Sequence, residues 1–335
     1  MKLFDSESLE HADLGEAGKC LNLYIARHSP TQGETLAQTR EHYVRDRPGS
    51  RGLAWSCSLP DAERKALWGD NSFTSPVTHC LVAEGAIASL WNWLKLDISI
   101  GPKDPFGDGF LRWKQDVLRT MVAAQVFWTE STDYWSDAIK SVLESQTMQF
   151  GIGRPAAVFL YKTIIFSNAS AIDPVLYDKL ACLITEIFPD ENGLEVARFD
   201  LRHPVRPSTA KFLKLLQTDV DCNQLLEQWF NPKTAAAGYE LNITLVRLAQ
   251  RCLAEGYRTN AERVLDLGYE RVPHLFSGKE PYEKFTSEAK KTPLPPPVRR
   301  KPTQAEIAAG KEVDADGNVL VSPAAYAYWK RTCRM

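Results

Sequence analysis

Apolar side chains recur at steps of three and four along much of this chain, which is the spacing of helices that bury one face. The first predicted helix follows Ser75-Pro76, a cap-then-proline start, and carries apolar residues at Val82, Ala86, Leu90 and Trp93. A second is predicted from the same spacing at Phe110, Trp113, Val117, Met121, Ala124 and Trp128. Further helices are predicted at 135–143, 156–166 and 174–188.

Seven of the nine tryptophans fall between Trp55 and Trp135. Their helical spacing predicts that they form core, where aromatic rings bury a large area. Trp91 and Trp93 are two positions apart and cannot share one helix face, so one of the two is predicted to be exposed and to anchor an interface.

Residues 208–267 read as two successive helical hairpins. The first combines Ser208–Gln217 with Leu225–Phe230, and the second combines Leu241–Gln250 with Asn260–Leu267. The two repeat after about 33 to 36 residues, a period typical of stacked helical hairpins. Within the second hairpin, an apolar stripe is predicted from Leu245, Leu248, Cys252 and Leu253.

The composition changes near residue 277. Pro293–Pro302 is predicted to be extended, because proline lacks the amide hydrogen that a helix needs. Lys311–Val321 alternates around Asp316-Gly317, which predicts a small β-hairpin. We therefore expect an all-α protein of antiparallel helical hairpins, partly solenoid-like, with a mixed segment at 1–72, a helical body at 73–276 and an extended C-terminal arm at 277–335.

The composition, 44% hydrophobic and 24% charged over 335 residues, is that of a folded protein, and the net charge of −2 gives no overall attraction to nucleic acid. The seven cysteines have neither disulfide-framework nor zinc spacing, so we predict a reducing intracellular compartment, the cytoplasm or the mitochondrial matrix. No apolar run reaches membrane-spanning length, and no metal or small-molecule cofactor is predicted.

The arm carries the first group of candidate binding residues. Arg299, Arg300 and Lys301 form a basic cluster suited to an acidic protein face or to phosphates. Tyr326, Tyr328 and Trp329 are large apolar surfaces near the end of the arm. Such side chains need something to pack against, so we expect the arm to dock on a partner protein or on the body of this chain.

The hairpins at 208–267 distantly resemble those of tetratricopeptide and pentatricopeptide repeat proteins, with Leu241–Gln250 like a first helix and Asn260–Leu267 like a second. The resemblance implies a binding role. If RNA is the ligand, it implies a basic face, for which the candidates are Lys211, Lys214, Arg247, Arg251, Arg258 and Arg263. An ordinary helical bundle with similar hairpin lengths is the alternative.

The segment Leu23–Thr35, with Arg27-His28 after Leu23-Tyr24-Ile25-Ala26, resembles the strand-then-Arg-His opening of the histidine phosphatase family. The resemblance implies that His28 accepts a phosphoryl group and that Arg27 holds phosphate. The chain departs from the family pattern at Ser29, where the family has glycine, and at Asp61, in a segment where it has a later arginine.

We therefore expect a non-catalytic scaffold or structural subunit of a larger protein or ribonucleoprotein assembly. It would bind through a helical face and through the arm. The alternatives are an RNA-associated helical-repeat protein of an organelle and a phosphomonoesterase that uses His28.

Overall fold

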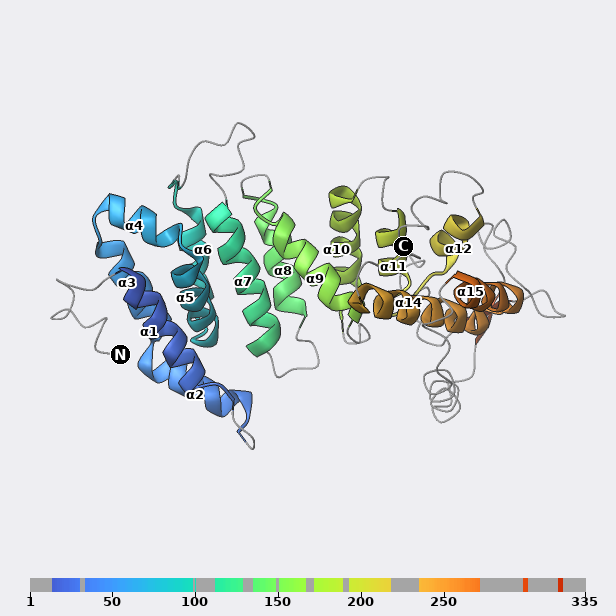
Figure 1. Cartoon of the computed structure of the whole chain (residues 1–335), viewed down its shortest axis with the longest axis horizontal. Coiled ribbons are helices and arrows are strands. Elements are labelled where there is room, and N and C mark those ends of the chain that lie inside the picture. The colour runs from blue at the N-terminus through green and yellow to red at the C-terminus, as the bar shows by residue number, and fades with distance from the viewer. Residues whose placement is uncertain are drawn as a thin grey trace. The chain divides into compact units, whose positions relative to one another are not determined.

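The computed structural model describes residues 14–30, 34–98, 100, 112–128, 135–148, 151–166, 172–188, 193–217, 235–271, 298–300 and 319–321. Over these residues the chain is 80% helical, which confirms the predicted all-α class. The chain divides into two compact units, residues 1–164 with 171–187 and residues 165–170 with 188–335 (Figure 1).

The first unit contains ten of the described helices, the last two residues of α9 falling in the second unit. They are α1 (Leu14–Arg27), α2 (Leu36–Asp46), α3 (Pro48–Ser58), α4 (Asp61–Trp68), α5 (Asn71–Ala83), α6 (Ile87–Lys95), α7 (Arg112–Trp128), α8 (Ser136–Ser145), α9 (Arg154–Phe166) and α10 (Pro174–Ile187). Four of them lie within 1–72, where the sequence pattern predicted only a mixed segment.

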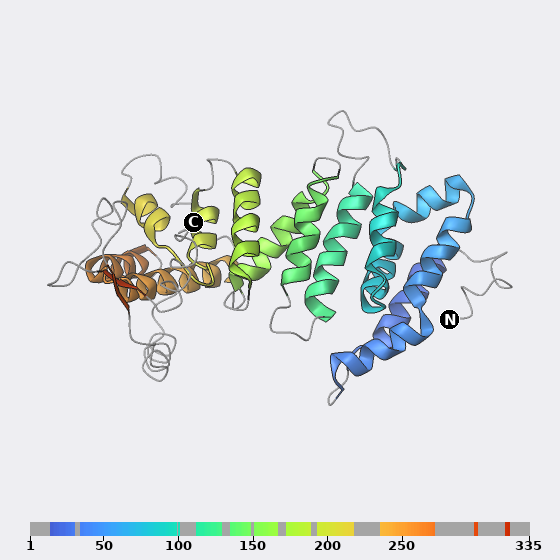
Figure 2. The ribbon, with the colours of Figure 1, turned by 180° about the vertical axis from the view of Figure 1, so that it is seen from behind.

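Helix α5 is the central element of the first unit. It packs against α1, α2, α3, α4, α6 and α7, and it runs beside α7 in Figures 1 and 2. Asp70 caps the helix by accepting a hydrogen bond from the Ser72 amide at 2.8 Å, so the predicted start at Ser75-Pro76 is wrong by one turn. Pro76 lies inside the helix and has no N–H to donate to the Ser72 carbonyl.

Two glycines allow neighbouring helices to approach α5 closely. A Cβ at Gly18 of α1 would collide with the Ser72 carbonyl oxygen, the one that Pro76 leaves without its helical donor. A Cβ at Gly49 of α3 would lie 2.6 Å from the Leu81 amide nitrogen. The missing side chains therefore fix where α1 and α3 cross α5.

The predicted tryptophan core is confirmed. The indole rings of Trp68, Trp93 and Trp113 form one cluster, with centroids 5.4 to 5.7 Å apart. Trp91 and Trp93 are both buried, at 9% and 2% exposure, so the expectation that one of them is exposed is wrong. Along α7, Trp113, Val117, Met121, Ala124 and Trp128 are buried as their spacing predicts.

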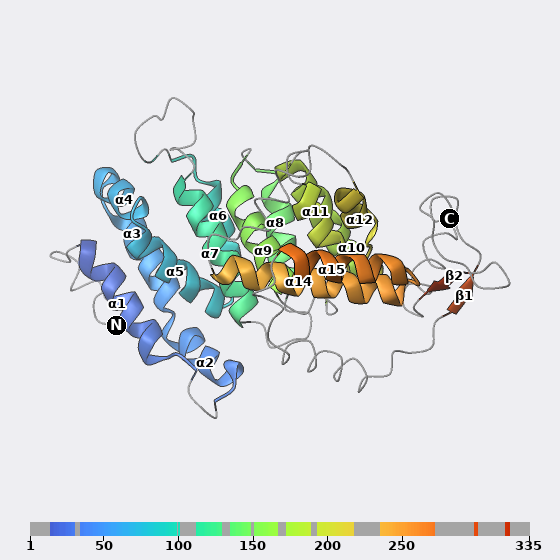
Figure 3. The same ribbon diagram turned by 45° about the vertical axis from the view of Figure 1, so that its right-hand side comes forward.

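The described helices of the second unit are α11 (Gly193–Asp200), α12 (Ala210–Gln217), α14 (Ala235–Ala254) and α15 (Arg258–Arg271). Helices α14 and α15 lie side by side (Figure 3), at the place predicted for the second hairpin. Gly256, at φ 86°, ends α14, and the Tyr257 amide returns to the Cys252 carbonyl at 2.7 Å. The second helix of the first predicted hairpin, 225–230, lies outside the described residues, and α12 packs against α11.

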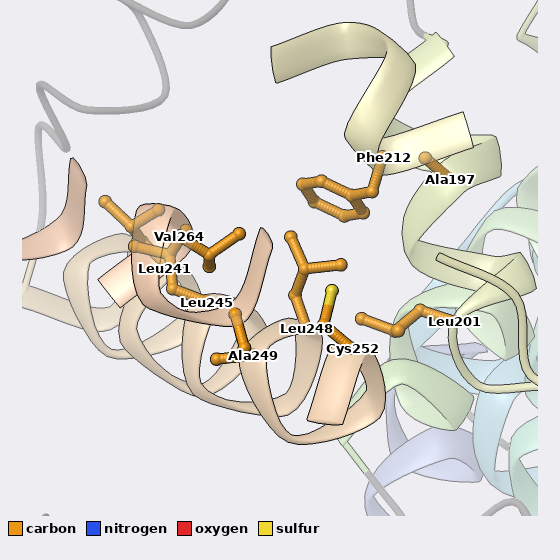
Figure 4. Close-up of a cluster of buried hydrophobic side chains, with 10 residues drawn as sticks. Ala197, Leu201, Phe212, Leu241, Leu245, Leu248, Ala249, Cys252 and Val264 are labelled. Atoms are coloured by element: carbon orange, nitrogen blue, oxygen red, sulfur yellow. The ribbon is translucent and has the colours of Figure 1, made fainter. Parts of the chain in front are cut away.

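The core of this unit is mainly aliphatic. Phe212 of α12 points toward Leu248 and Cys252 of α14 (Figure 4), with Leu245 and Val264 in the same cluster. The predicted stripe is confirmed at Leu245, Leu248 and Cys252, which are fully buried. It is wrong at Leu253, which is 55% exposed because it lies one helical step beyond the packed face.

In the C-terminal arm, β1 (Val298–Arg300) pairs antiparallel with β2 (Val319–Val321), with Arg299 opposite Leu320. The sequence predicted a hairpin whose two strands both lie within 311–321. In the structure, β2 pairs instead with β1, which lies in the proline-rich segment. Residues 298–301 contain no proline, so their amides can donate hydrogen bonds to a neighbouring strand, whereas Pro297 and Pro302 on either side have no N–H to donate.

Candidate functional site: a basic pocket beside helix α1

A surface pocket of about 650 Å³ opens in the first unit beside the C-terminal half of α1. Helix α1 supplies one wall, and the junction of α2 and α3 supplies the other. The lining residues are Cys20, Leu23, Tyr24, Arg27, His28, Arg45, Asp46 and Arg51. Three arginines face one aspartate, so the lining carries more positive than negative charge.

The sharp turn between α2 and α3 brings Arg45, Asp46 and Arg51 to the same place. Thr35 and Gln38 form a capping box that starts α2. Arg47, at φ 49°, both ends α2 and precedes α3, and Pro48 then sets the first turn of α3. The left-handed conformation at this single residue therefore changes the direction of the chain at the pocket wall.

The start of α3 is held by the carboxyl group of Glu84, the residue that follows α5. Glu84 accepts hydrogen bonds from the Gly49 amide and, at 3.0 Å, from the Ser50 amide. Burial raises the pKa of the Glu84 carboxyl, while the hydrogen bonds from Ser50 and Gly49 act in the opposite direction. The helix N-terminus next to Arg51 is thus already occupied by a carboxyl group of this chain.

Asp46 is satisfied inside the pocket wall. The Tyr24 hydroxyl donates to Asp46 Oδ2 at 2.9 Å, and Arg45 Nε donates to Oδ1 at 2.8 Å. The hydrogen bond from Arg45 is the largest cause that lowers the pKa of Asp46, so this carboxylate is ionised at neutral pH. Burial, followed by Asp46, raises the pKa of Tyr24, which remains a neutral donor.

Two histidines lie close together at the edge of the pocket. The His28 ring lies 4.4 Å from the Tyr24 ring and 4.8 Å from the His42 ring, centroid to centroid. Burial lowers the pKa of His28, and His42 and Arg27 lower it further, so His28 is neutral at pH 7. The lining therefore owes its positive charge to arginine.

Arg27 and His28, which the sequence suggested as a phosphatase site, lie together in the structure with Arg45, Asp46 and Arg51. The sequence patterns did not suggest these last three as site residues. Leu23–Arg27 is the last part of α1, so it is helical and departs from the strand that precedes the histidine in the phosphatase motif. The sequence signal that could have pointed to Arg45, Asp46 and Arg51 is the arginine-rich segment Arg45-Asp46-Arg47-Pro48. Its proximity to α1 depends on how α1 and α2 pack on α5.

Three of the six residues of the predicted basic face of the second unit make the following contacts within the chain. Lys211 pairs with Asp200 at 2.9 Å, and Arg251 pairs with Glu255 at 2.8 Å. Arg247 Nη1 donates to the Ile165 carbonyl at 3.2 Å. Lys214 and Arg263 are exposed, and the side chain of Arg258 lies outside the described residues.

For the arm, the structure gives only the backbone of Arg299 and Arg300, as part of β1. Lys301, Tyr326, Tyr328 and Trp329 lie outside the described residues. Within the described ranges, no group of three or more His, Cys, Asp or Glu side chains is placed to hold a metal ion. No helix in that part of the chain is long and apolar enough to cross a membrane.

Comparison with models of known families, with curated proteins and with solved structures gives no match. The fold and the pocket by themselves define an all-α protein with a basic, solvent-open pocket on its N-terminal unit.

Proposed function

We propose that this chain is a non-catalytic binding subunit of a larger protein assembly, and that its N-terminal unit contacts a partner at the basic pocket. The observation that carries the proposal is the pocket lining, in which arginines from α1, α2 and α3 converge on one open surface. The proposed second contact is the C-terminal arm, with Arg299, Arg300, Lys301, Tyr326, Tyr328 and Trp329.

The rigidity of the walls supports a binding role. Glycine crossings fix α1 and α3 on α5, and Glu84 holds the first turn of α3. A site whose walls are set before the partner arrives loses little conformational entropy on binding. The same arginines on flexible loops would have to be ordered at each encounter.

The proposal is tested by affinity purification of the full-length chain from native extract, followed by quantitative mass spectrometry. Three forms are compared: wild type, the pocket variant Arg27→Glu/Arg51→Glu, and the control Arg119→Glu/Lys162→Glu. Both control residues are exposed in the first unit and outside the pocket, and the control makes the same change in charge.

We expect one set of proteins to co-purify with wild type and control and to be lost from the pocket variant. Equal recovery with all three forms would contradict the role of the pocket. If nuclease treatment removes the set and RNA co-purifies with every form, the RNA-associated alternative is favoured instead.

A further inference from the structure

The pocket lining has an apolar side as well as a basic one. Cys20, Leu23, Tyr24 and Arg27 lie at steps of three and four, so they share one face of α1. Leu23 is 69% exposed, although it lies within this concave surface. An occupant that covers Leu23 and also meets Arg27 must carry an apolar group next to an anionic one.

The basic side of the pocket has an arginine, Arg27, that is available to a ligand. Asp46 is held by Tyr24 and Arg45, so the carboxylate of the pocket already has two partners other than Arg27. Among the residues that the structure describes, the Arg27 side chain has no hydrogen-bond or ion-pair partner. A guanidinium fork binds a carboxylate in a bidentate manner, so Arg27 is placed to receive one from outside.

The openness of the pocket favours a polypeptide over a small molecule. Sites for small ligands bury most of the ligand surface. Here Leu23 is mostly exposed and the Arg45 side chain is 67% exposed, so a small ligand would remain largely in water. A polypeptide segment that continues beyond both ends of the pocket does not need to bury its whole surface there.

We propose that the pocket binds an acidic segment of a partner protein, with its carboxylates on Arg27 and Arg51 and an apolar side chain against Leu23 and Cys20. The inference rests on the proposed function and names the chemistry of the partner.

The test measures fluorescence anisotropy of labelled peptides with the full-length protein. The probe peptide alternates glutamate and leucine, one control peptide has glutamine in place of glutamate, and a second has serine in place of leucine. The protein forms are wild type, Arg27→Gln/Arg51→Gln and the control Arg119→Gln/Lys162→Gln.

We expect the glutamine peptide and the pocket variant each to weaken binding about tenfold or more, as the loss of charge-assisted hydrogen bonds predicts. The serine peptide should bind more weakly than the probe peptide, and the control variant should bind like wild type. Raising the salt from roughly 0.05 to 0.5 M should weaken the interaction of the probe peptide with wild type.

Equal binding of the glutamate and glutamine peptides would overturn the inference. So would a phosphoserine peptide that binds about tenfold more tightly than the probe, since the preferred group would then be a phosphate. If no acidic peptide binds while the native partners still depend on Arg27 and Arg51, the proposed function stands and the carboxylate assignment fails. If the probe binds but no native partner depends on the pocket, the proposed function fails.

Discussion

Two sets of arginines, one from each unit, differ in their surroundings. In the second unit, Arg202 and Arg247 both donate to the Ile165 carbonyl near the end of α9, and Arg251 pairs with Glu255. In the first unit, Arg27 and Arg51 line an open pocket. Arg247 and Arg251, which the sequence suggested as part of a binding face, thus make contacts within the fold. The acceptors that surround an arginine in the fold, and not its spacing along the chain, decide whether it can serve a partner.

The cores differ as well. The first unit is built on aromatic contacts, such as Tyr43 with Trp128 at 5.1 Å and the cluster around Trp68. The core cluster of the second unit is mainly aliphatic, with Phe212 as its aromatic member. Because seven of the nine tryptophans belong to the first unit, tryptophan fluorescence reports mainly on that unit, whereas far-ultraviolet circular dichroism reports on both.

The largest expected effect is that of Leu248→Asp in the second unit. Leu248 is fully buried among Leu245, Cys252 and Phe212, and an unpaired carboxylate there costs several kcal/mol. That is a large part of a typical stability of about 5–15 kcal/mol. We expect loss of helical signal in thermal unfolding with little change in the tryptophan transition.

Leu253→Asp is the matched control, since it makes the same change one residue beyond Cys252, at a 55% exposed position. Its midpoint should stay close to that of wild type. Equal damage from both substitutions, or a tryptophan transition that moves together with the helical signal, would contradict the separation of the two units.

The next effect is that of Gly49→Ala in the first unit. The new Cβ would lie 2.6 Å from the Leu81 amide nitrogen, and backbone cannot move aside as a side-chain end can. We expect a loss of about 3 kcal/mol, the upper end for overpacking, read from the tryptophan transition in urea.

Gly69→Ala provides the comparison for that substitution. Its Cβ would first meet the Ile100 Cγ2 methyl group at 3.0 Å, which can rotate away. Its effect should stay within about 1 kcal/mol in either direction. If Gly49→Ala is equally mild, the close crossing of α3 and α5 is not what fixes the pocket wall.

The sequence patterns predicted the helical class, the buried face of α7 and the core positions Leu245 and Leu248, because helical spacing reports burial directly. They did not predict the start of α5, where Asp70 rather than Ser75 caps the helix and Pro76 is tolerated inside it. They also could not assemble the pocket. Its residues come from three helices that all pack on α5, with α1 also packed on α3, and such tertiary packing cannot be read from the local sequence.

A third effect concerns pH and belongs to the aromatic core of the first unit. His79 accepts a hydrogen bond from Trp128 Nε1 at 3.1 Å, and burial lowers the pKa of His79 from 6.5 to about 4. Between these values the unfolded chain binds a proton that the folded chain does not, so stability falls as the pH drops from 6.5 toward 4. We expect a contribution of about 2–3 kcal/mol.

His79→Gln keeps an acceptor for Trp128 but does not titrate. The difference in stability between wild type and this variant, measured by urea unfolding at several pH values, isolates the histidine from Asp46 and Glu84. A difference that is constant between pH 4 and 6.5 would show that His79 is not buried as a neutral ring.

The smallest effect tests the two roles of arginine directly, by replacing Arg247 and Arg27 with glutamine. Arg247 is half-buried and donates to the Ile165 carbonyl, but burial lowers its pKa and Arg202 also donates to this carbonyl. These opposing terms leave a net loss of about 1 kcal/mol for Arg247→Gln. Arg27 is exposed, so Arg27→Gln should change stability by less than about 0.5 kcal/mol.

Urea unfolding followed by circular dichroism and by tryptophan fluorescence measures both variants. A destabilisation by Arg27→Gln as large as that by Arg247→Gln would mean that Arg27 is needed for folding. The pocket would then lose the arginine that the structure leaves for a partner.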